Sequence, residues 1–118
     1  MHLKDYTFVA LDLETTGLSP LRDTIIEVAA VRFNLEKEGE KYIAITDDER
    51  SMLIDPGRTL EENISMITGI TDSMLKGKVK WGEVREKVRE FIGDSIIVGH
   101  NVLFDIAMLE SHGIDLSR

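Results

Sequence analysis

Residues 8–17 read Phe-Val-Ala-Leu-Asp-Leu-Glu-Thr-Thr-Gly, an apolar run that ends in two carboxylates and a small polar turn. Residues two apart on a strand point to the same face, so Asp12 and Glu14 are expected side by side at the end of a buried strand. Like charges held this close repel each other, and burial strengthens the repulsion. A divalent cation that prefers hard oxygen ligands resolves the conflict, so this stretch predicts a Mg²⁺ or Mn²⁺ site.

The alternative interpretation of this stretch is a strand that merely ends at a polar turn. That is common for any single Asp or Glu. The five specified residues of Asp-x-Glu-Thr-Thr-Gly have a chance probability on the order of 10⁻⁴ in a chain of this length. The metal site is therefore the favoured interpretation.

Composition limits the kind of protein this can be. The 118 residues, 42% hydrophobic and 31% charged, are typical of one soluble domain with one core. The absence of cysteine excludes a disulfide framework and a thiolate zinc site. Short apolar stretches and the lack of a leader at the N-terminus favour a cytoplasmic protein with no membrane partner. The net charge of −8 excludes a broad electrostatic grip on duplex nucleic acid, but not action on a nucleic-acid end.

The first part of the chain is expected to form an antiparallel meander of three strands. Apolar residues at both alternating sets of positions predict that 5–13 is a central strand buried on both faces. A second strand is expected over 25–33, followed by a charged hairpin turn over 34–40. Residues 41–46 and 51–54 both suit a strand, with an acidic run between them. This leaves open one strand interrupted by a loop or a small extra hairpin.

The second part of the chain is expected to alternate helices with one strand. Residues 60–76 predict one or two short helices, the second capped by Thr71. Apolar residues at helical spacing predict a helix over 81–92, closed by a glycine. A short buried strand over 96–98 and a helix from residue 102 follow. The expected fold class is an α/β layered domain with a mixed sheet.

A second candidate segment, Gly99-His100-Asn101-Val102-Leu103-Phe104-Asp105, follows the 96–98 strand and opens the last helix. Asp105 would then lie in the first helical turn, near the positive end of the helix dipole, which alone needs no functional explanation. Ligands gather at strand ends in open α/β sheets. We therefore expect Asp105 to join Asp12 and Glu14 in one carboxylate site.

The segments 12–17 and 100–105 resemble the first two exonuclease motifs of the four-acid (DEDD) 3′–5′ exonucleases, and 67–71 resembles the turn between them. The likeness is to the DEDDh type, in the form found in proofreading subunits and polymerase-embedded domains of bacterial replication. It implies a ribonuclease-H-like mixed sheet and hydrolysis of terminal phosphodiesters by two Mg²⁺ or Mn²⁺ ions. It also implies a single-stranded 3′ end of DNA as substrate, RNA as the alternative substrate, and a DNA polymerase as partner.

Residue roles follow from the resemblance. Asp12 and Glu14 bind the catalytic metal, Asp12 also bridges to a second metal, and Asp105 supports that second metal. The family often has His where this chain has Thr68. For the apolar candidates, plain core packing is an equal alternative. The implied nucleotide-binding residues are Thr15, Thr16, Leu18, Ile67, Thr68, His100 and Phe104.

The family's third motif supplies a fourth acid and a general-base His several dozen residues beyond the second motif. Only residues 106–118 follow Asp105, and His112 and Asp115 are too close to it to replace that motif. We therefore expect a single exonuclease-like domain over 1–118 whose C-terminal part is missing, whose activity is impaired and which self-associates or is only marginally stable. The alternative is a catalytically inactive nucleic-acid-binding or assembly module of the same fold.

Overall fold

A central strand, β1 (Thr7–Thr15), organises a four-stranded sheet in the computed structural model, which describes residues 2–116. β1 pairs antiparallel with β2 (Ile25–Glu38), and β2 pairs antiparallel with β3 (Lys41–Leu53). On its other side, β1 pairs parallel with β4 (Ile96–Val98), which gives the strand order β3-β2-β1-β4. The predicted mixed sheet, a meander followed by a β/α unit, is confirmed.

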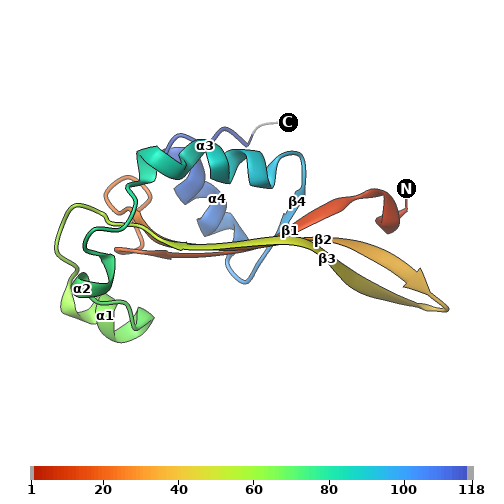
Figure 1. Ribbon diagram of the computed structural model, residues 1–118, viewed down its shortest axis with the longest axis horizontal. Coiled ribbons are helices and arrows are strands. Elements are labelled where there is room, and N and C mark those ends of the chain that lie inside the picture. Colours follow the sequence, from red (N-terminus) through yellow and green to blue (C-terminus); the bar gives the residue numbers. More distant parts are fainter. Residues whose placement is uncertain (1, 117–118) are drawn as a thin grey trace.

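Helices connect and cover this sheet (Figure 1). A single 3₁₀ turn, η1 (Leu3–Asp5), precedes β1. Two short helices, α1 (Glu62–Thr68) and α2 (Asp72–Leu75), lie together at one end of the sheet, away from the β2–β3 hairpin tip. The longer helices α3 (Trp81–Ile92) and α4 (Val102–Ser111) lie together over one face of the sheet. Across residues 2–116, no helix has the length and apolar character needed to cross a bilayer.

The main core lies between the sheet and the helices α3 and α4. Alternate β1 residues, Val9, Leu11 and Leu13, are buried there. The helices supply apolar side chains at helical spacing, which places them on the face turned to the sheet. Each such side chain contributes roughly 1.5–3 kcal/mol when fully buried. The helix residues of this core are Val84, Val88, Phe91, Ile92, Met108 and Leu109.

Only one face of β1 is covered by helices, so the prediction of burial on both faces is wrong. On the second face Phe8 is buried, but its ring stacks on Phe33 of the neighbouring strand, with 5.4 Å between ring centroids. Ala10 is half-buried and Asp12 is exposed. Cross-strand stacking, and not a helix, explains the apolar residue that suggested a covered face.

Strand limits also differ from the sequence-based expectation. The first strand starts at Thr7, because the 3₁₀ turn occupies residues 3–5. The second strand runs on through most of the expected turn over 34–40, to Glu38, and the real turn is Gly39 and Glu40. Gly39 has a φ of +65°, a conformation that favours glycine. The charged residues that suggested a turn lie instead on the exposed hairpin.

The third strand is continuous, with no interrupting loop. The register between β2 and β3 shifts next to Arg32, which leaves Asp47 as the extra residue of a bulge. The acidic run is tolerated because Arg32 contacts Asp47 at 2.7 Å and Arg50 contacts Asp48 at 2.6 Å. The 96–98 strand, expected to be buried, is half-exposed at the sheet edge.

Candidate active site

Asp12 and Glu14 stand at the carboxyl end of β1, two residues apart and therefore on one face of the sheet. Asp12 is exposed and Glu14 is half-buried. Their position is set by the buried alternate residues of β1, which hold the strand against α3 and α4. The carboxylates thus occupy the face of β1 that is turned away from the main core.

Asp105 reaches the same place from the start of α4. The chain leaves β4 at Gly99, which passes so close to β1 that a Cβ there would lie 2.7 Å from the carbonyl oxygen of Leu11. The same position is 3.8 Å from Asp105 Oδ2. Close passage of Gly99 therefore brings the first turn of α4, with Asp105, beside the end of β1.

The three carboxylates interact electrostatically. Asp105 is only 4% exposed, and burial raises its pKa to about 6, with the charges of Asp12 and Glu14 adding to the increase. Burial also raises the pKa of Glu14, and Asp12 and then Glu27 raise it further. Asp12 and Glu14, which the sequence predicts to share a site with Asp105, thus both make ionisation of Asp105 more costly.

The donor set of this group fits a hard divalent cation. Carboxylate oxygens are the ligands that Mg²⁺ and Mn²⁺ prefer. Burial is the main cause of the raised pKa of Asp105, and a cation would offset the charges of Asp12 and Glu14 that add to it. Among residues 2–116, however, no three His, Cys, Asp or Glu side chains are arranged to hold a metal ion. Metal binding by Asp12, Glu14 and Asp105 would therefore require a change in the arrangement of these side chains.

A cavity of about 430 Å³ opens beside Glu14. Five of the predicted nucleotide-binding residues line it: two threonines and Leu18 from the loop after β1, and Ile67 and Thr68 from α1. Leu18 is 85% exposed and Ile67 is 78% exposed, so core packing does not explain either residue. The five are Thr15, Thr16, Leu18, Ile67 and Thr68.

The hydroxyl groups of these threonines are engaged in local hydrogen bonds. Thr15 Oγ1 donates to the carbonyl of Gly17 at 2.6 Å. Thr68 Oγ1 donates to the carbonyl of Ile64 at 2.8 Å and accepts from the backbone N–H of Ile70 at 3.1 Å. They therefore shape the loop and the helix end that border the cavity.

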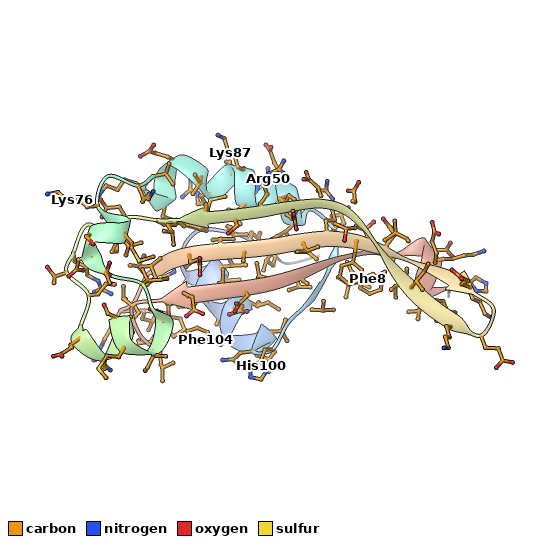
Figure 2. The ribbon with its side chains drawn as sticks, turned by 60° about the horizontal axis from the view of Figure 1, so that its bottom comes forward. Phe8, Arg50, Lys76, Lys87, His100 and Phe104 are labelled. Carbon is orange, nitrogen blue, oxygen red and sulfur yellow. The ribbon has the colours of Figure 1, made fainter. Side chains whose placement is uncertain are left out.

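His100 and Phe104 do not line this cavity. Figure 2 shows both at the start of α4, away from Arg50 and Lys87 on the α3 side. His100 is exposed, whereas Phe104 is half-buried and packs against the main core. The position of Phe104 therefore agrees with the alternative of plain core packing.

Asp23 and Arg58 were missed by the sequence analysis. Asp23 lines the cavity and contacts Thr16, and Arg58 contacts both of them. The sequence gives no signal for Arg58, because its contacts join segments tens of residues apart. A glycine followed by a carboxylate within one loop was the only local clue.

Comparison with known proteins places this geometry in a family. Residues 9–113 match the RNase_T exonuclease family, a span that includes both carboxylate segments. The chain belongs to this exonuclease family. That membership confirms the resemblance found in the sequence.

Curated relatives of this exonuclease-family chain are much longer proteins. It is 42% identical over 117 residues to a DNA polymerase III PolC-type from Pediococcus pentosaceus, which covers 96% of this chain and 8% of the relative. It is 45% identical over 105 residues to a DNA polymerase III PolC-type from Thermotoga maritima, which covers 89% of this chain and 7% of the relative. The chain thus spans less than a tenth of the length of these relatives.

Solved structures share the fold of this exonuclease-family chain. Escherichia coli exonuclease I in complex with a 5cy-dA13 oligonucleotide superposes with a TM-score of 0.71 at 23% identity, over 88% of this chain and 23% of that one. An exonuclease I complex with SSB-Ct gives a TM-score of 0.70 at the same identity and coverage. This likeness confirms the ribonuclease-H-like mixed α/β fold.

Proposed function

We propose that this chain is a 3′–5′ exonuclease domain that hydrolyses the terminal phosphodiester of a DNA strand with two bound Mg²⁺ or Mn²⁺ ions. The observation that carries the proposal is the electrostatic grouping of Asp12, Glu14 and Asp105 next to a cavity. Family membership supports nuclease chemistry, since the matched span contains all three acids.

The three acids have distinct parts in this proposal. Asp12 and Glu14 would hold one cation, and Asp12 with Asp105 would hold the second. Bound cations of this kind activate water and stabilise the leaving oxygen of an in-line displacement. Without them, the site repels a phosphodiester, because the carboxylates and the net charge of −8 oppose its approach.

The cavity beside Glu14 is the proposed binding site of the terminal nucleotide. Leu18 and Ile67 present exposed apolar surface on two sides of it, which suits the faces of a base. A polymerase as partner is supported by the PolC-type relatives. Single-stranded DNA as substrate is supported by the exonuclease I structure that contains a 5cy-dA13 oligonucleotide. RNA is the alternative substrate, and a comparison of matched DNA and RNA strands separates the two.

The test is a time course with a single DNA strand carrying a 5′ label. Incubation with Mn²⁺ is expected to give a ladder that shortens from the 3′ end, and omission of the cation or Asp12→Ala is expected to abolish it. Asp47→Ala is the matched control, because it removes one exposed carboxylate from the β3 bulge, far from Asp12. The same time course measures the rate, which the sequence analysis predicts to be low.

Three outcomes contradict this proposal. Cleavage that persists in Asp12→Ala would assign the activity to another site or to a contaminant. Binding of the strand with no cleavage under any cation would favour the inactive nucleic-acid-binding module. A strand shortened from its 5′ end would contradict the proposed direction of attack.

A further inference from the structure

The loop over residues 16–23 is closed by one carboxylate. Asp23 Oδ2 accepts a hydrogen bond from the backbone N–H of Ser19 at 2.9 Å, and Oδ1 accepts one from the Thr16 hydroxyl at 3.0 Å. The Ser19 bond is the main cause that holds the pKa of Asp23 below its ordinary value. Gly17 packs so tightly against this carboxylate that a Cβ would overlap it. The loop is therefore built around the Asp23 carboxylate.

Arg58 joins this carboxylate from 35 residues further along the chain. Its guanidinium lies 3.3 Å from Asp23 Oδ1 and hydrogen-bonds the Thr16 hydroxyl. Thr16 is only 8% exposed, and its hydroxyl also accepts from the backbone N–H of Thr24 at 3.0 Å. Arg58 thus connects to both the start and the end of the loop.

The segment that carries Arg58 is itself fixed. On one side, Asp55 accepts from the backbone N–H of Gly57 at 2.8 Å and pairs with Lys80 at 3.0 Å. On the other side, the backbone N–H of Leu60 donates to Asp72 at 2.8 Å. Arg58 therefore extends from a held segment that leads directly into α1.

The two walls of the cavity come from these two parts of the chain. One wall is the loop after β1, with Asp23, and the other is residues 61–68 at and just before α1. The α1–α2 unit packs through a small core of its own, which Ile26 of β2 shares with Leu60, Ile70 and Leu75. Arg58 is a polar connection between that unit and the loop, although it does not itself line the cavity.

We propose that Arg58 is a positioning residue that sets the separation of the two cavity walls through Asp23 and Thr16. The inference rests on the proposed function, because it treats the cavity as the nucleotide-binding site. Arg58 is expected to affect nucleotide binding without touching the metal-binding carboxylates. Its guanidinium bridges Thr16 and Asp23, and a lysine ammonium cannot reproduce that planar arrangement of donors.

The experiment compares Arg58→Ala and Arg58→Lys with Arg22→Ala, which removes an exposed arginine from the same loop. Binding of dTMP with Mg²⁺, and of uncharged thymidine, is followed by NMR titration, and amide exchange is read at Ser19 and Thr24. Arg58→Ala is expected to speed exchange at both amides and to raise the Kd of both ligands about tenfold. Arg58→Lys should recover part of the loss, Arg22→Ala should bind like the wild type, and Mg²⁺ affinity should stay constant.

Each other result overturns the inference in a recognisable way. Faster amide exchange with unchanged Kd would mean that the contacts of Arg58 with Asp23 and Thr16 only support the loop and do not affect nucleotide binding. A loss confined to dTMP would mean that Arg58 contacts the phosphate directly, and an equal loss in Arg22→Ala would mean a general charge effect. A wild-type chain that binds neither ligand would contradict the proposed function itself, whereas binding that Arg58→Ala leaves intact contradicts only the positioning role.

Discussion

Glu14 and Glu27 lie directly opposite each other in the β1–β2 ladder, at the last pair before the register shifts between Glu14 and Thr15. Like charges in this position destabilise a sheet. Burial is the largest cause of the raised pKa of Glu14, and Asp12 and Glu27 add to it. Glu14 is therefore repelled by Asp12 on its own strand and by Glu27 on the neighbouring strand. A bound cation would relieve this repulsion.

Glu27→Gln is expected to stabilise the metal-free protein by about 0.2–1 kcal/mol, because it removes the like charge opposite Glu14. Urea unfolding near neutral pH measures the change. Glu36→Gln is the control, since Glu36 is exposed on the hairpin and lies opposite Ile43. A lower free energy of unfolding for Glu27→Gln, or an equal gain for both variants, would contradict the role assigned to this pair.

Asp105 should make metal-free stability depend on pH. Its pKa is raised from an ordinary value of 3.8 to about 6, so between these values the folded state binds more protons than the unfolded state. The free energy of unfolding should therefore fall as pH rises through this window and level off above it. The measurement is the difference between wild type and Asp105→Asn across the window in urea. The prediction would be wrong if the difference in the free energy of unfolding stayed constant, or if the wild type gained stability relative to Asp105→Asn as pH rises.

The order of strands and helices could be predicted from the sequence because it depends on local patterns. The helical spacing of apolar residues located α3, and Thr71 accepts a hydrogen bond from the backbone N–H of Met74 as the predicted cap of α2. The limits of β2 and β3 could not be predicted. Charged residues that suggest a turn are equally compatible with an exposed hairpin, and only the β2–β3 pairing decides between them.

The candidate site likewise has some residues that local sequence patterns predict and others that they do not. Asp12 and Glu14 were brought together by strand alternation alone, and Asp105 by the start of a helix. The contact of Arg58 with Asp23 depends on the folded path of the chain, and no spacing in the sequence encodes it. The uncovered face of β1 was missed because Phe8 is buried by Phe33, a residue of a different strand.

Mn²⁺ or Mg²⁺ should raise the melting temperature, because a ligand that binds only the folded state stabilises it. Asp12→Ala should abolish this rise and should leave the metal-free protein as stable as the wild type or more so, since it removes a repelling charge. Glu36→Ala, which removes an exposed carboxylate from the hairpin, should retain the full rise. Melting curves that do not respond to either cation would exclude the metal site.

The most direct test of the shared carboxylate site is an NMR titration of the Asp105 carboxyl group with and without Mg²⁺, a cation that leaves the signal visible. Without the cation, the Asp105 pKa should be near 6, as burial and the neighbouring Asp12 and Glu14 require. Saturating Mg²⁺ should lower it below its ordinary value, because the cation favours the ionised form. An Asp105 pKa that is the same with and without Mg²⁺ would contradict the metal site on which this account depends.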